Sequence, residues 1–112
     1  MLEVPIEDPN YKDKMNIITA LYNVIDPELF VNIIDLGLVY GVDFYEEELK
    51  IKITMTFSTK ACPLGDTIKQ GVTNVLSMAY PEFETDIDIV WDPEWNFDML
   101  TPDGRIQLGL DY

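Results

Sequence analysis

The sequence predicts a single α+β domain in which two helices cover a small mixed sheet, a two-layer arrangement with the order α-β-β-α-β. Three observations lead to this prediction. One apolar stretch with helical spacing precedes a pair of alternating segments, and a second stretch with helical spacing follows that pair. A third alternating segment comes after the second helical stretch. The 112 residues are enough for one hydrophobic core and too few for two.

The first expected element is a helix that begins at Asp13. Its apolar side chains recur at i, i+3, i+4 and i+7, which makes one stripe. They are Ile18, Leu21, Tyr22 and Ile25. Pro27 is expected to end the helix, because a proline disfavours helical geometry at the residue before it. Residues 1–12 contain two prolines and no clear period, so we expect a flexible arm in front of a domain over 13–112.

Two strands are expected next. Residues 38–45 alternate in side-chain type, and residues 49–58 alternate strictly between apolar and polar residues. Strict alternation gives a strand one buried and one wet face. The acidic connection at 46–48 is short, which predicts an antiparallel hairpin.

The second helix is expected from Pro63 to Met78, since proline suits the first helical turn. Its expected buried side chains are Ile68, Val72, Val75, Leu76 and Ala79. A third strand is expected at 85–91, with acidic residues on its wet face. The remaining tail is rich in turn residues, and a short strand is expected at 105–110.

Charge and hydropathy exclude several classes of partner. The formal net charge is −14, with 21 acidic against 7 basic residues, so phosphate backbones are repelled and nucleic acid is not expected. The apolar runs are a few residues long, whereas a membrane-spanning helix needs about 20. An acidic N-terminus unlike a signal peptide and a lone cysteine favour a cytoplasmic protein. The acidic surface is interpreted either as solubilising or as a docking face for a basic partner.

The one cysteine, Cys62, is the candidate reactive group. It precedes Pro63 at the expected start of a helix, where the helix dipole and the nearby Lys60 favour a thiolate. Ser58 and Thr59 offer hydroxyl groups beside it. The other interpretation is a small buried hydrophobic side chain. The chain has no histidine, which excludes a Cys-His pair, and we expect it not to be an enzyme.

A thiolate is a good ligand for soft metals, so Cys62 is the expected metal ligand. An iron–sulfur cluster usually needs about four thiolates, and this chain supplies one. Any cluster would therefore be transient and shared with a partner or a small thiol. Three acidic residues follow the first helix, and they are interpreted as helix termination and solvation or as part of a loop that covers Cys62. They are Asp26, Glu28 and Asp35. Trp91, Pro93 and Trp95 are interpreted as core closure or as a wall beside the site.

Six short motifs occur in the order of a known family. They are Asp26-Pro27-Glu28, Ile34 to Tyr40, Met55-Thr56, Cys62-Pro63-Leu64, Trp91 to Trp95 and Gly104 to Gly109. With these motifs the chain resembles the SufT/PaaD-like metal–sulfur cluster biosynthetic family, also called domain of unknown function 59. The resemblance implies an α+β domain with a cysteine at the start of its second helix. The chain lacks the additional C-terminal cysteines of the PaaD branch, which favours the single-domain, SufT-like branch.

The resemblance implies an accessory role in iron–sulfur cluster assembly. The chain would transiently carry a cluster, or present client proteins, through Cys62. The residues that match the family's cluster-binding region are Cys62, Thr59, Asp26, Glu28 and Asp35, and Ser58 stands where threonine is expected. Expected partners are apo iron–sulfur client proteins or a cluster scaffold, and a second copy of the chain in a homodimer. Two alternatives stay open: a thiol-dependent enzyme that uses Cys62, and an interaction module in which Cys62 is structural.

Overall fold

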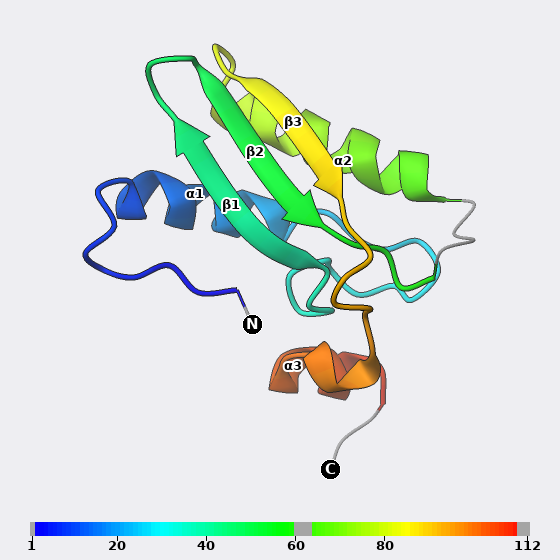
Figure 1. The fold of residues 1–112 in the computed structure, drawn as a ribbon. Coiled ribbons are helices and arrows are strands. Elements are labelled where there is room, and N and C mark those ends of the chain that lie inside the picture. Colours follow the sequence, from blue (N-terminus) through cyan, green and yellow to red (C-terminus); the bar gives the residue numbers. More distant parts are fainter. Residues whose placement is uncertain (1, 60–63, 110–112) are drawn as a thin grey trace.

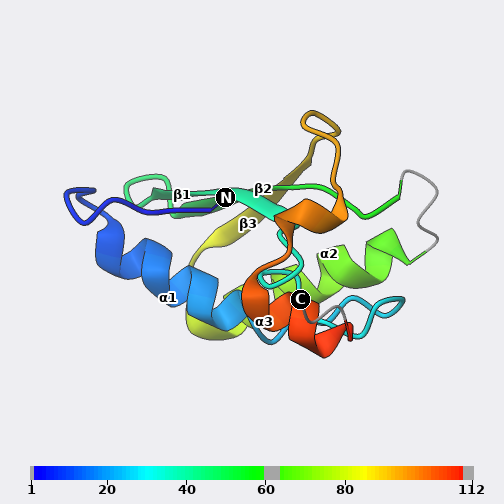
Figure 2. The same cartoon turned by 90° about the horizontal axis from the view of Figure 1, so that it is seen from below.

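The computed structural model describes residues 2–59 and 64–109. Its elements are α1 (Tyr11–Leu21), β1 (Val39–Tyr45), β2 (Lys50–Met55), α2 (Gly65–Ala79), β3 (Glu84–Ile89), the 3-10 helix η1 (Phe97–Met99) and α3 (Pro102–Gln107). The strands form one sheet in the order β1-β2-β3, and α1 and α2 lie together on one of its faces (Figures 1 and 2). The predicted two-layer α+β architecture is therefore confirmed.

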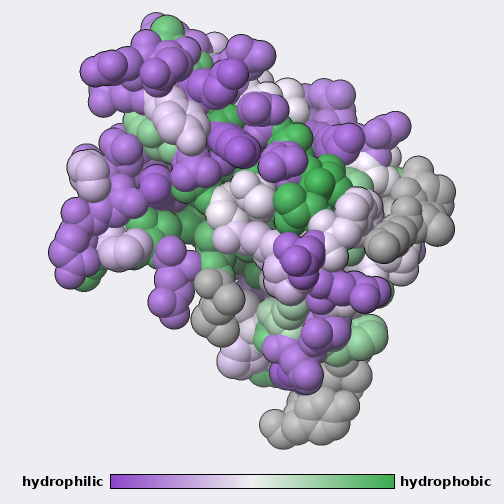
Figure 3. Space-filling view, in the orientation of Figure 1, coloured by the Kyte–Doolittle hydropathy of each residue, from purple (hydrophilic) through white to green (hydrophobic). Residues whose placement is uncertain are grey.

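The sheet is mixed, as predicted. β1 and β2 form an antiparallel hairpin, whereas β2 and β3 are parallel because α2 carries the chain back across the helical layer. Along β2 the side chains of Ile51, Ile53 and Met55 are completely buried beneath the helices, while the residues between them are half-buried on the open face. Figure 3 views this open face: hydrophilic side chains cover the β1–β2 turn, and an apolar patch lies over the ends of β2 and β3.

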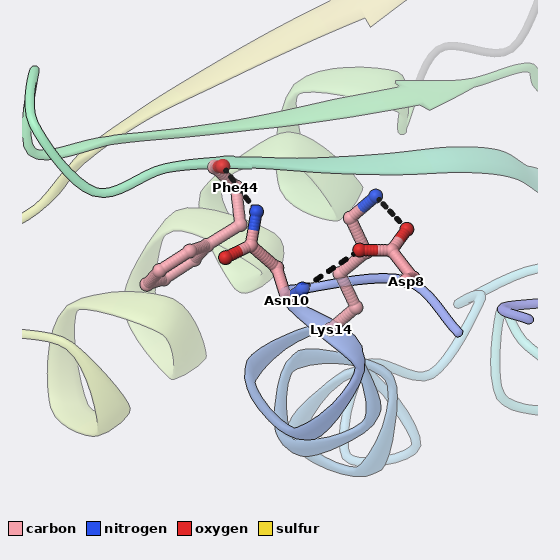
Figure 4. A network of polar contacts seen from close by, with 4 residues as sticks. All are labelled: Asp8, Asn10, Lys14 and Phe44. Atoms are coloured by element: carbon pink, nitrogen blue, oxygen red, sulfur yellow. Dashed lines mark hydrogen bonds and ion pairs between the residues drawn. The ribbon is translucent and has the colours of Figure 1, made fainter. Parts of the chain in front are cut away.

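The start of α1 is tied to β1. The Lys14 Nζ lies 2.8 Å from the Asp8 Oδ2, and the Asn10 side chain donates to the carbonyl oxygen of Phe44 (Figure 4). The helix begins at Tyr11, two residues earlier than the predicted Asp13. Leu2 and Val4 are partly buried against the core. The flexibility of the arm over 1–12 stays a prediction.

The predicted end of α1 at Pro27 is wrong, because the helix ends at Leu21. After it the chain turns, and Val24 is buried while Tyr22 and Ile25 of the expected stripe are largely exposed. The Ile33 N–H donates to the Val24 carbonyl at 3.0 Å, and Ile25 forms an isolated bridge with Asn32. Pairing with a later segment therefore replaces the helical hydrogen bonds that the apolar pattern predicted.

Helix α2 buries Ile68, Val72 and Leu76 as predicted, and Val75 is partly buried against the core. Ala79 was expected in this stripe and is exposed, because it is the last residue of the helix. The helix begins at Gly65 with Leu64 as its N-cap. The predicted start at Pro63 lies outside the described residues. Among residues 2–59 and 64–109, every helix is too short or too polar to cross a bilayer.

The short strand predicted at 105–110 is wrong, because this segment contributes to α3. The Thr101 hydroxyl accepts a hydrogen bond from the Gly104 N–H at 3.0 Å, and Pro102 occupies the first helical turn. Both features stabilise a helix start. The tail packs as a helix against the loop before β1, where the Thr101 hydroxyl donates to the Asp35 Oδ1 at 2.9 Å.

Candidate functional site

Most of the predicted site residues lie at one end of the molecule. In both views the loop between α1 and β1 (residues 22–38) and the segment after β2 (residues 56–59) reach the end at which α2 begins (Figures 1 and 2). Cys62 and Lys60 lie outside the described residues.

The segment after β2 is held in place by an aromatic contact. Phe57 packs directly on the first residue of α2: a Cβ added to Gly65 would lie 2.9 Å from the Phe57 Cε2. The Phe57 ring also contacts Trp91, with 6.0 Å between the ring centroids. Ser58 is half-buried and Thr59 is exposed. The close packing at Gly65 thus brings the end of this hydroxyl-bearing segment next to the start of α2.

Asp26 is an almost fully buried carboxylate, with 1% of its surface exposed. Its Oδ1 accepts hydrogen bonds from the N–H groups of Glu28 at 2.7 Å and Leu29 at 3.2 Å. Its Oδ2 is buried and accepts no hydrogen bond from any described residue. Buried oxygens of this kind are rare in folded proteins. Within residues 2–59 and 64–109 this buried acceptor has no donor, whereas the Glu28 side chain is exposed.

Asp35 is engaged by the chain's own donors. Its Oδ2 accepts from the side-chain amides of Asn32 at 2.7 Å and Gln107 at 3.3 Å, and its Oδ1 accepts from the Thr101 hydroxyl at 2.9 Å. The Thr101 N–H also donates to the Asp35 carbonyl oxygen at 2.9 Å. These bonds fasten α3 to the loop before β1. The expected part of Asp35 in cluster binding stays a prediction.

The two tryptophans after β3, which were interpreted as core closure or as a wall beside the site, have different surroundings. The Trp95 indole N–H donates to the carbonyl oxygen of Leu36 at 2.6 Å, and its ring packs against Phe97 at 5.1 Å between centroids. Trp95 therefore closes the core beneath the loop. Trp91 is more exposed, and it lies against Phe57 beside the segment that leads toward Cys62.

The loop has an acidic electrostatic environment. Burial raises the pKa of the Tyr22 hydroxyl, and the carboxylates of Asp35 and Asp103 raise it further. Over the described residues, no group of three or more His, Cys, Asp or Glu side chains is arranged to hold a metal ion. Hard carboxylates are in any case poor ligands for a soft cluster, so the described groups can frame a thiolate site but cannot replace its sulfur.

A cavity of about 800 Å³ borders the loop before β1, since Tyr22, Ile34 and Gly37 line part of it. It is formed by the N-terminal segment, α1, β1 and η1, and side chains that include Leu2, Met15, Val39 and Met99 line it. Of the predicted site residues that the structure describes, Asp26, Glu28, Asp35, Ser58 and Thr59 do not line it, whereas Pro93 does.

Four side chains with a part in this region were not predicted from the sequence. Thr101 could have been found, because a threonine before a proline is a typical helix start. Asn32 and Gln107 carry no sequence signal, because their pairing with Asp35 depends on contacts across the fold. Phe30, an exposed aromatic residue in the same loop, was also missed.

Comparison with known proteins identifies the family. The family described as "Iron-sulfur cluster assembly protein" matches residues 14–89. The chain belongs to this family. The resemblance to SufT-like proteins is confirmed: the chain is 39% identical over 87 residues to "Fe-S protein maturation auxiliary factor SufT" of Staphylococcus aureus, covering 78% of this chain and 98% of that protein.

Other relatives agree. The chain is 42% identical over 97 residues to "Fe-S protein maturation auxiliary factor YitW" of Bacillus subtilis, covering 87% of this chain and 94% of the relative. A crystal structure of a domain of unknown function 59 from Bacillus anthracis matches with a TM-score of 0.80 and 38% identity over 86% of this chain and 91% of that one. A conserved hypothetical protein from Thermotoga maritima matches with a TM-score of 0.72 and 29% identity over 86% of this chain and 93% of that one.

Proposed function

We propose that the chain is an accessory factor in iron–sulfur cluster assembly that handles the cluster as cargo through Cys62. The observation that carries the proposal is the match to relatives named Fe-S protein maturation auxiliary factors, which covers 87% of the chain at 42% identity in one of them. The family match over residues 14–89 includes Cys62 and the loop that holds Asp26 and Asp35.

The donor set favours transient handling over stable binding. The chain has one cysteine and no histidine, and the described residues offer no cluster of metal-binding side chains. Since a cluster usually takes four thiolates, the missing ligands would come from a client protein, a cluster scaffold, a small thiol or a second copy of the chain. The absence of histidine, the usual base beside a reactive cysteine, also supports a carrier or adaptor that is not an enzyme.

The first test is genetic. In a strain that lacks this protein, the activity of an iron–sulfur enzyme is compared after complementation with the wild type, with Cys62→Ser and with Met78→Ser. Met78 is a control because it is highly exposed near the far end of α2. We expect wild type and Met78→Ser to restore the enzyme and Cys62→Ser to fail while keeping its thermal stability. Full restoration by Cys62→Ser would exclude the thiolate mechanism.

The second test measures cluster binding in vitro. The purified chain is incubated with iron and sulfide, with and without glutathione, and its visible absorbance and iron content are measured after gel filtration. We expect low occupancy alone and higher occupancy with the added thiol, because the thiol supplies missing ligands. A stoichiometric cluster that survives gel filtration without the thiol would contradict a transient carrier.

A further inference from the structure

Phe30 has an unusual backbone conformation and an unusual exposure. Its φ angle is +60°, in the left-handed region that bulky residues rarely adopt and that glycine or asparagine ordinarily fills. Its side chain is 79% exposed, whereas the next residue, Val31, is 1% exposed. The ring therefore contributes little to the core, and the backbone that carries it is strained. Because Phe30 costs stability and has few contacts within its own chain, its presence calls for an explanation other than folding.

The loop that carries Phe30 is rigidly braced. The Phe30 N–H donates to the Asp26 carbonyl oxygen at 2.8 Å, and the Asp26 N–H donates to the Val31 carbonyl oxygen at 2.9 Å. Inside this turn, the buried Asp26 carboxylate accepts hydrogen bonds from the N–H groups of Glu28 and Leu29. Strain persists only where the surroundings over-determine the conformation, and these bonds do so. The aromatic ring is thereby presented to solvent in a fixed backbone frame.

The position of the loop links Phe30 to the proposed function. The loop over residues 22–38 reaches the end of the molecule at which the segment after β2 ends and α2 begins (Figures 1 and 2). A protein that exchanges a cluster at Cys62 would approach this end. A rigid exposed aromatic side chain is the typical anchor of such a contact, because little conformational entropy is lost when it is buried.

We propose that Phe30 is a binding anchor that inserts into an apolar pocket with a basic rim on the iron–sulfur protein that receives or delivers the cluster. This inference rests on the proposed function. The basic rim follows from charge: the chain has a net charge of −14, so at this contact a positively charged surface is favoured over a second copy of the chain. The occupant is therefore a different protein, not a second subunit.

The chain offers a matched control. Leu49 also has a positive φ angle, +52°, and is 43% exposed, but it lies in the β1–β2 turn at the opposite end of the sheet. The variants are Phe30→Gly, Phe30→Tyr and Leu49→Gly. Each is measured for its thermal midpoint, for restoration of an iron–sulfur enzyme in the deletion strain, and for binding to the purified apo form of that enzyme.

We expect both glycine variants to unfold at or above the wild-type midpoint, since glycine relieves the left-handed strain. Only Phe30→Gly should bind the apo enzyme about tenfold more weakly or worse, as is typical when an anchor is removed, and fail to restore it. Phe30→Tyr keeps the ring and should act like the wild type.

Three results would overturn the anchor: full restoration by Phe30→Gly, a clearly lowered midpoint for that variant, or a wild-type dimer in sedimentation that Phe30→Gly abolishes. An iron–sulfur enzyme that stays fully active in the deletion strain would instead overturn the proposed function, and the anchor with it. The two failures are thus distinguishable.

Discussion

Replacing Gly104 by alanine tests how α3 is fastened to the loop that carries the candidate site. A Cβ at this position would lie 2.5 Å from the Asp35 carbonyl oxygen and 3.1 Å from its carbonyl carbon. Both atoms belong to the backbone and cannot rotate away. To reach ordinary van der Waals contact at 3.4 Å, the helix and the loop must separate by about 0.9 Å.

Two opposing effects decide the sign. Alanine in a helix is favoured over glycine by up to about 1 kcal/mol. Overpacking costs about 1–3 kcal/mol, and a separation of this size also breaks the 2.9 Å hydrogen bond from the Thr101 N–H to the Asp35 carbonyl oxygen, which is worth about 1 kcal/mol. We therefore expect Gly104→Ala to lower the free energy of unfolding by about 2 kcal/mol.

Urea unfolding followed by circular dichroism measures this change, with Gly41→Ala as the control. A Cβ at Gly41 would meet the Thr54 Cβ at 3.7 Å, which is ordinary contact, so this variant should be neutral or slightly stabilised. If Gly104→Ala proved as stable as the wild type, the close contact between α3 and the loop would be refuted.

Two further predictions concern polar contacts elsewhere in the fold. Trp95→Phe should lower the free energy of unfolding by about 1–3 kcal/mol, because the carbonyl oxygen of Leu36 loses its 2.6 Å partner; a midpoint equal to that of the wild type in urea would contradict this. The hydrogen bond from Lys14 holds the pKa of the Asp8 carboxyl below its usual value, so Asp8 stabilises the fold above pH about 4, and this stability is lost as the pH falls through the lowered pKa. Asp8→Asn should thus unfold more easily than the wild type at pH 7, and this difference should shrink as the pH falls through the lowered pKa; a difference that does not change with pH would exclude the ion pair.

The sequence by itself determined the sheet and the family. The strict alternation over 49–58 predicted β2 with its buried and open faces, and the short acidic connection after β1 predicted the hairpin, because both signals are local. The site motifs likewise indicated the family over most of the chain, and the comparisons confirmed it. Cys62 was singled out on chemistry alone, and its role stays a prediction.

Only the tertiary structure decided where the segments around the site end and what they hold. The apolar spacing after Leu21 is helical, yet the chain leaves the helix there because Val24 pairs with Ile33 within the loop. The expected strand at 105–110 is replaced by α3, which docks on Asp35. In each case the deciding hydrogen bonds join segments far apart in the sequence or close a loop back on itself. Local periodicity in the sequence does not predict such bonds, because tertiary packing determines which groups are paired.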